Sequence, residues 1–186
     1  MELKGERIIP APVDRTWQAL NDPAVLKASI AGCESLERVG DDRFQALMAV
    51  RVGPVSARFK GQLQLTDVQP PQRYTIHFEG QGGVAGFGKG SAEVQLEPQG
   101  ERTRLSYHAR AQVGGKIAQV GSRLVDAAAA KITQDFFEAF EVALQPAGEV
   151  VAPPAPSAPA APSRAWIGWA VAAALLAAAL LWWAAR

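Results

Sequence analysis

The amino-acid sequence predicts an α+β domain of the helix-grip type, a curved antiparallel sheet around a long C-terminal helix, followed by a C-terminal transmembrane helix. Three observations predict it. Apolar and polar residues alternate over five segments between positions 43 and 111. Apolar residues then recur every three or four positions from Lys116 to Leu144. Finally, the segment from Ala165 to Ala185 carries no charge over a length that crosses a bilayer core of roughly 30 Å.

The N-terminal part predicts one strand and two short helices. Residues Glu2 to Pro10 are typical of a first strand. Pro12 fits the first turn of a helix, since proline at this place leaves no hydrogen bond unmade. That helix would bury Val13, Trp17 and Leu20. The sequence Asn21-Asp22-Pro23 ends it and begins a second helix that runs to about Ser29.

The alternating segments predict an antiparallel sheet with one dry and one wet face. Short turns such as Gly53-Pro54 join the strands. The residues expected on the dry face are Phe44, Ala46, Met48, Val50, Val52, Val55, Ala57, Phe59, Gly61, Leu63, Leu65, Tyr74, Ile76, Phe78, Ala92, Val94, Leu96, Leu105, Tyr107, Ala109 and Ala111.

A single helix over Lys116 to Leu144 is expected to cover the dry face. Gly114-Gly115 ends the last strand before it. The apolar positions of this helix are Ile117, Val120, Leu124, Ala128, Ile132, Phe136, Phe140 and Leu144.

The C-terminal part divides into a tether and an anchor. Residues 1–145 form the domain, 146–164 a Pro/Ala-rich linker, and 165–185 the transmembrane anchor. The linker composition favours extended polyproline II, which could hold the domain up to roughly 50 Å from the bilayer. Tryptophans lie at both ends of the anchor, as in an aromatic belt: Trp166, Trp169, Trp182 and Trp183. The alternative is a helix buried in a soluble core, which the Pro-rich tether argues against.

The composition argues against some classes of function and indicates a location. The 19 basic and 18 acidic residues nearly balance, which argues against bulk nucleic-acid binding. The one cysteine, Cys33, allows no internal disulfide. The charged start Met1-Glu-Leu-Lys-Gly-Glu-Arg has no apolar signal region. The expected location is therefore the inner (cytoplasmic) membrane, with a C-terminal single-pass anchor and the domain facing the cytoplasm.

The order of elements resembles the START-like (SRPBCC) superfamily. Within it, five segments are similar to the CoxG family, the G subunits of carbon monoxide dehydrogenase: Leu20-Asn-Asp-Pro-Ala-Val-Leu, Ile30-Ala-Gly-Cys-Glu-Ser-Leu, Val52-Gly-Pro-Val-Ser-Ala-Arg-Phe-Lys-Gly, Gly90-Ser-Ala and Gly114-Gly-Lys-Ile-Ala-Gln-Val-Gly-Ser-Arg-Leu. The resemblance implies a non-catalytic accessory protein, without a covalent cofactor, that recruits a carbon monoxide dehydrogenase-type molybdenum hydroxylase to the cytoplasmic membrane. It also implies a cavity for an apolar ligand, of which a respiratory quinone is the natural candidate.

The residues themselves support a ligand space without proving it. Large and small side chains mix on the expected dry face, so small groups opposite small groups leave either a void or a close backbone contact. Ordinary tight packing of helix on sheet stays an alternative. The expected ligand contacts are Phe59, Tyr74, Phe78, Phe87, Tyr107, Leu124, Ala128 and Phe136. Tyr74 or Tyr107 could donate a hydrogen bond to a quinone carbonyl. All these assignments rest on strand parity, and a one-residue slip would move them.

The glycine-rich segment Gly80 to Gly90 is not a nucleotide-binding loop. Gly90 stands where a phosphate-binding loop needs Ser or Thr to hold magnesium, and strands flank the segment on both sides. We expect either a segment at the cavity rim, with Phe87 as an apolar gate, or a plain flexible hairpin connection.

The ionisable residues show no catalytic pattern. His77 and His108 fall on the wet face, and neither a metal-ligand spacing nor a Ser-His-Asp arrangement is legible. Cys33, expected in a loop after Gly32, fits a small packing residue better than a nucleophile. A basic stripe on the wet face could dock an acidic partner or anionic headgroups, or be simply solvated: Arg43, Arg51, Arg58, Lys60, Arg102, Arg104 and Arg110. Two other functions therefore stay open, a START-like aromatase/cyclase and a ligand-free membrane-tethering module.

Overall fold

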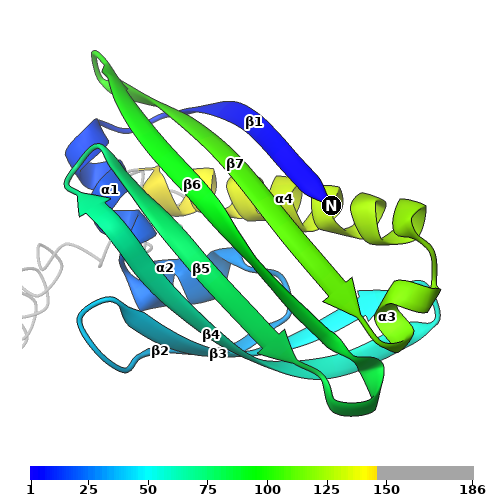
Figure 1. Ribbon diagram of the computed structural model, residues 1–186. Coiled ribbons are helices and arrows are strands. Elements are labelled where there is room, and N and C mark those ends of the chain that lie inside the picture. Colours follow the sequence, from blue (N-terminus) through cyan, green and yellow to red (C-terminus); the bar gives the residue numbers. More distant parts are fainter. Residues whose placement is uncertain (146–186) are drawn as a thin grey trace, which may run out of the picture. The chain divides into compact units, whose positions relative to one another are not determined.

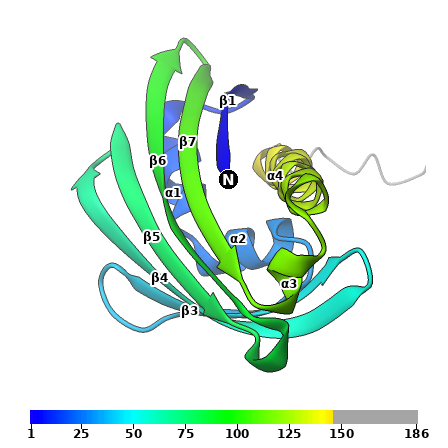
Figure 2. The same ribbon diagram turned by 45° about the vertical axis from the view of Figure 1, so that its right-hand side comes forward.

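A computed structural model describes residues 1–145, and they form one sheet with helices on its concave side (Figures 1 and 2). The seven strands run in the order β1-β7-β6-β5-β4-β3-β2, and every neighbouring pair is antiparallel. This confirms the α+β class and the curved antiparallel sheet. The elements are β1 (Glu2–Ile9), α1 (Val13–Leu20), α2 (Pro23–Ser29), β2 (Cys33–Arg38), β3 (Arg43–Val52), β4 (Val55–Gln69), β5 (Arg73–Gln81), η1 (Gly83–Ala85), β6 (Phe87–Gln99), β7 (Arg102–Gly114), α3 (Lys116–Gln119) and α4 (Ser122–Leu144).

The predicted parity of the strands is confirmed on both faces. Inward residues such as Phe44, Tyr74 and Leu105 are at most 4% exposed. Their sequence neighbours Arg43 and Arg73 are exposed. The alternation works because successive side chains of a strand point to opposite faces, and only one face packs against the helices.

The long C-terminal helix is interrupted, which corrects the prediction of one helix over Lys116 to Leu144. A single turn, α3, ends at Gln119, and α4 begins at Ser122. Gly121 between them has φ +97°, a conformation that glycine adopts without the steric cost of a Cβ atom. Because the chain turns here, the face that α3 presents does not continue along α4.

Helices α1 and α2 close one end of the concave side. The Asp22 side chain accepts a hydrogen bond from the Ala24 N–H at 2.8 Å, and Pro23 occupies the first position of α2. The fully buried residue of α1 is Thr16, whereas the predicted core residue Trp17 is half-buried. The Thr16 hydroxyl donates to the Thr103 hydroxyl at 3.3 Å, so a buried polar group finds a partner.

Two separate apolar clusters hold the helices to the sheet. The main cluster joins α1, α2 and the C-terminal half of α4 to the sheet, and Phe140 at its centre is 0% exposed. The turn-end cluster is small and consists of Val52, Ile117 and Val125 with the half-buried residues packed on them. The helix-covered face is therefore firmly packed at both ends.

Two further predictions can be compared with the fold. Cys33 begins β2, a strand that alternation does not reveal, and does not lie in a loop. No helix among residues 1–145 is long and apolar enough to cross a membrane. The predicted linker 146–164 and anchor 165–185, with Trp166, Trp169, Trp182 and Trp183, lie outside the described residues.

Candidate functional site

The candidate site is the stretch of the inner face between the two clusters, here called the central gap. Its apolar residues point inward by strand parity or helix phase, are half-buried, and belong to neither cluster. In a filled core such residues would be closed to solvent, because helix-on-sheet packing normally leaves few voids. Their partial exposure therefore shows that the helices leave this part of the inner face open to solvent. The residues are Leu3, Phe78, Ala92, Ala109, Ala111 and, on α4, Ile132.

Glycines on neighbouring strands let aromatic rings lie flat at the walls of the central gap. A Cβ atom on Gly90 would come within 2.8 Å of Phe78 Cζ, and one on Gly82 within 2.6 Å of the Phe59 ring. Real Cβ atoms do not approach so closely, so a side chain at Gly82 would displace the Phe59 ring, and one at Gly90 would also clash with the Arg110 carbonyl oxygen. The two rings therefore lie directly over these glycines, on the inner face.

A tyrosine and an arginine supply polar groups beside the central gap. Tyr107 lies over Gly5 of β1, and its ring centroid is 5.4 Å from that of Phe137. The guanidinium of Arg7 lies 5.6 Å from the same Phe137 ring, a cation–π contact. Tyr107 can thus offer a hydroxyl close to an apolar space, which is the arrangement expected of a pocket that orients a mainly apolar ligand.

The predicted ligand contacts divide into three groups. Phe78 lies in the central gap itself. Phe59 and Ala128 pack against the turn-end cluster, while Tyr107 and Phe136 pack against the main cluster, so these four flank the gap.

The remaining three predicted contacts lie elsewhere. Tyr74 is 4% exposed inside the main cluster, edge-on to Trp17 at 5.3 Å, and burial raises the pKa of its phenol. Phe87 pairs with Gln81 and Gly114 on the outer face, so it is not a gate at an inner rim. Leu124 is 49% exposed, and Val125 is the residue that faces the sheet.

Sequence reasoning missed residues on β1 and α4. Leu3 and Arg7 point inward with Ile9, which is 0% exposed. Their alternation is present in the sequence as Leu3-Lys-Gly-Glu-Arg7-Ile-Ile9, but the glycine and the charge conceal it. Phe137, 4% exposed, takes the central place that the helical spacing gives to its neighbour Phe136.

The outer face carries a polar trough of about 1330 Å³ that crosses the sheet from β1 to β3. Two rows of outward-facing cross-strand neighbours flank it. The first row is Glu2, Arg110, Ser91, His77, Gln64 and Arg43, and the second is Gln112, Lys89, Glu79, Gln62 and Gln45. Both histidines point to the outer face as predicted: His77 is 3.1 Å from the Thr66 hydroxyl, and His108 pairs with Glu2.

Metal-ligating side chains do not cluster in the described domain. Over residues 1–145, no three His, Cys, Asp or Glu side chains lie together as a metal site would require. Cys33 is half-buried, and this desolvation raises the pKa of its thiol, which lowers the thiolate fraction. The residues that line the central gap itself are apolar, and the polar groups beside it are the Tyr107 hydroxyl and the Arg7 guanidinium.

A comparison of the sequence with models of protein families shows the family of this chain. The family model of the carbon monoxide dehydrogenase G subunit (CoxG) matches residues 5–145. The chain belongs to the CoxG family. A search of curated proteins finds no match.

Solved structures agree with this assignment. A conserved protein from Geobacillus kaustophilus is 31% identical, with a TM-score of 0.73, over 77% of this chain and 95% of that one. A Thermus thermophilus protein is 21% identical (TM-score 0.59; 77% and 97% covered). The Zhui aromatase/cyclase from a Streptomyces species is 16% identical (TM-score 0.57; 77% and 93% covered). The last two show the START-like fold alone.

The share of the Geobacillus chain that is matched also indicates whether the domain can fold by itself. The Geobacillus structure consists almost wholly of the part equivalent to the CoxG domain, since 95% of its chain is matched. Residues 1–145 of this chain likewise fall within one compact unit. The domain therefore has the core and the boundaries of a unit that folds by itself.

Proposed function

We propose that this CoxG protein is a membrane-anchored accessory protein that binds an apolar ligand, a respiratory quinone, in the central gap. One observation carries the proposal: apolar inner-face residues between two packed clusters remain half-buried. An unfilled apolar space costs roughly 24 cal/mol per Å³ in stability, so a ligand that fills it would restore what the packing lacks. The hydroxyl of Tyr107 would donate a hydrogen bond to a ligand carbonyl.

The accessory role follows from the family and from the partner that its name implies. We propose that the domain recruits a carbon monoxide dehydrogenase-type molybdenum hydroxylase to the cytoplasmic membrane, with the anchor at residues 165–185 holding it there. The polar trough on the outer face is the proposed docking surface for this enzyme. Non-obligate protein interfaces are polar at their rim and hydrogen-bonded, which suits a trough lined by four glutamines and charges of both signs.

The same observations give less support to two other functions. An aromatase/cyclase would need a general acid or base facing the ligand, and the central gap offers beside its apolar lining the Tyr107 hydroxyl and the Arg7 guanidinium, without a histidine or carboxylate among the residues named. A ligand-free tethering module would need a filled inner face, against which the half-buried residues argue.

The test uses the soluble domain, residues 1–145, purified from cells that contain its native membranes. Organic extraction and mass spectrometry should recover a quinone in a one-to-one ratio with protein. In the same domain Trp17 is the sole tryptophan, so quinone analogues can be titrated by the quenching of its fluorescence. Ala109→Leu should block the gap and abolish saturable quenching, whereas Phe87→Ala on the outer face should leave it unchanged. An empty extract without saturable quenching would leave tethering as the better account.

A further inference from the structure

The two ends of the described domain differ in charge. Three segments meet at one end: 50–60 around the β3–β4 turn, 80–90 around η1, and 114–124 from the end of β7 through α3 to the start of α4. They hold six cations and no acidic residue: Arg51, Arg58, Lys60, Lys89, Lys116 and Arg123. The turns at the opposite end, 38–43, 66–73 and 97–104, hold five acidic residues and five arginines, so their charges cancel.

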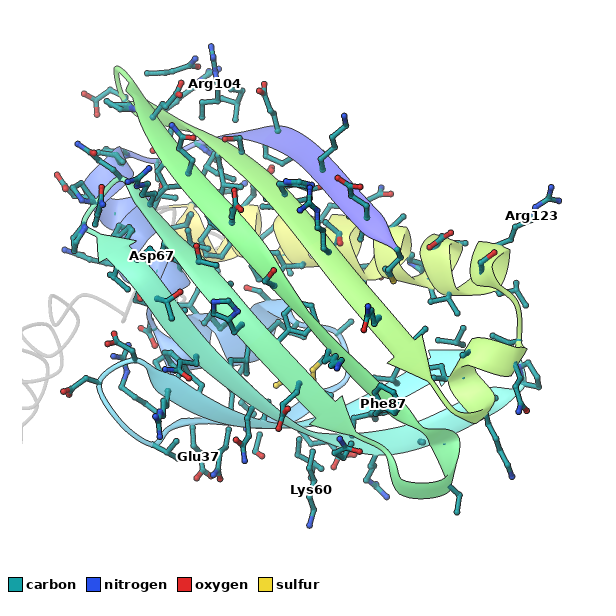
Figure 3. The ribbon with its side chains drawn as sticks, in the orientation of Figure 1. Glu37, Lys60, Asp67, Phe87, Arg104 and Arg123 are labelled. Carbon is teal, nitrogen blue, oxygen red and sulfur yellow. The ribbon has the colours of Figure 1, made fainter. Side chains whose placement is uncertain are left out.

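Contacts confirm that the three basic segments form one surface, here called the basic end. A Cβ atom on Gly53 would lie 3.5 Å from Leu124 Cδ1, which brings the β3–β4 turn to the start of α4. The backbone of Gly86 is packed against Gly114 and Gly115, and η1 also contacts β4 and α3. In Figure 3, Lys60 and Arg123 extend away from the ribbon at this end, while Asp67 and Arg104 lie at the other.

Exposed apolar side chains accompany these cations. Val84 at the tip of η1 is 86% exposed, Leu124 is 49% exposed, and Phe87 is 40% exposed. All six cations are exposed, and Arg58 alone among them has an ion-pair partner in the described domain, Glu34 at 2.8 Å. The N-terminus of the 23-residue helix α4 adds the positive end of its dipole to the same surface.

We infer that the basic end docks the domain on an anionic lipid surface. Basic residues near an anionic membrane attract its headgroups, and apolar tips can enter the boundary between headgroups and acyl chains. An acidic protein is the rival occupant. Lipid fits better because exposed apolar side chains accompany the cations, above all Val84 at 86% exposure, and a surface that combines basic and apolar side chains is typical of segments that lie at a bilayer interface.

The predicted linker is long enough for the basic end to face the bilayer. Helix α4 ends at Leu144, away from the basic end, and its 23 residues span about 35 Å. The linker 146–164 could extend to roughly 50 Å if it adopts polyproline II. The domain could therefore turn its basic end toward the bilayer that holds the anchor, although the inference itself needs neither the anchor nor a bound quinone.

Vesicle flotation with residues 1–145 tests the inference. The domain should float with phosphatidylcholine vesicles that contain phosphatidylglycerol, should stay behind with pure phosphatidylcholine, and should be released by salt. Each cation near the surface is worth about five-fold in affinity, so Lys116→Gln combined with Arg123→Gln should weaken binding about 25-fold. Val84→Asp should weaken it further by placing a carboxylate among the headgroups.

Matched variants at the far end keep the test specific. Val142 is 66% exposed on α4 and Arg102 is exposed beside the β6–β7 turn, so Val142→Asp and Arg102→Gln repeat the same chemical changes away from the basic end. Both should float like the unsubstituted domain. The inference is overturned if the unsubstituted domain does not float with anionic vesicles, or if the far-end variants lose as much affinity as those at the basic end.

Discussion

Enlarging an alanine inside the central gap gives the sharpest test of whether the inner face is filled. Ala109 is half-buried between Leu3 and Ala92, its cross-strand neighbours, and belongs to neither apolar cluster. Leucine adds three carbon atoms there. At about 0.8 kcal/mol for each buried methylene, full burial would gain about 2.4 kcal/mol, and half-burial about 1 kcal/mol. Ala109→Leu should therefore leave the free energy of unfolding unchanged or raise it by about 1 kcal/mol.

The matched control is an alanine in the packed part of the same face. Ala46 is 9% exposed in the main cluster, and a Cβ atom on its neighbour Gly61 would already touch its side chain at 3.8 Å. Overpacking such a site costs about 1–3 kcal/mol, so Ala46→Leu should destabilise the domain. The assay is urea unfolding of residues 1–145 followed by circular dichroism. If Ala109→Leu destabilises the domain as much as Ala46→Leu does, the inner face is filled and the central gap does not exist.

Three further predictions concern the helix phase, the cysteine and the start of β1. Phe140→Ala should cost about 3–5 kcal/mol in urea unfolding because this ring is 0% exposed, whereas Leu124→Ala, at 49% exposure, should cost less than about 1 kcal/mol. Burial raises the pKa of Cys33, so iodoacetamide should alkylate the folded domain at pH 8 more slowly than it does the urea-unfolded chain. The hydrogen bond from His108, with the nearby charge of Arg110, lowers the pKa of Glu2 below 4.5, and NMR titration should find a higher pKa in His108→Ala, where the hydrogen bond is lost and Arg110 remains. Its small contribution to stability is present above pH 4.5 and is lost as the pH falls through the lowered pKa.

The strands and their faces could be predicted because each buried face imposes a strict two-residue period. Parity alone assigns Tyr74, Val94 and Leu105 to the inner face, and each is buried. The short strand β2 escapes this reasoning because Leu36 is its one fully buried residue, so no run of alternation identifies it. Strand periodicity thus identifies a strand when several of its inward residues are apolar. It fails when only one of them is.

The predicted stripe of the C-terminal helix is confirmed at Ile117, Phe140 and Leu144, which are buried, but not at Leu124, because the sequence offers adjacent apolar residues there. Leu124-Val125 and Phe136-Phe137 are adjacent apolar pairs, and either member fits a spacing of three or four. Counting forward from Ile117 selects Leu124 and Phe136. The turn at Gly121 breaks that count, so Val125 faces the sheet in place of Leu124, whereas Phe136 packs against the main cluster beside the more deeply buried Phe137.

The position of Phe87 could not be predicted for a related reason, because it follows a loop. A glycine-rich segment has no hydrophobic period, so the sequence does not reveal where strand pairing resumes after it. The pairing of Phe87 with Gln81 and Gly114 fixes its face, and that pairing depends on the close approach of Gly86 to Gly114 and Gly115. The predicted gate at the inner rim is wrong because register, a long-range property, decides the face.

The three proposed surfaces occupy different parts of one domain, and this has a consequence for how they could work together. The central gap opens on the inner face, the basic end lies at the β3–β4 and β5–β6 turns, and the trough crosses the outer face. A domain docked on lipid by its basic end would keep the trough free for an enzyme, because the two rows that flank the trough lie on the outward side of the strands. Lys89 belongs to both the trough and the basic end. A partner seated over the full trough would therefore compete with the bilayer for this one side chain, which would couple enzyme docking to release of the basic end without any change in the fold.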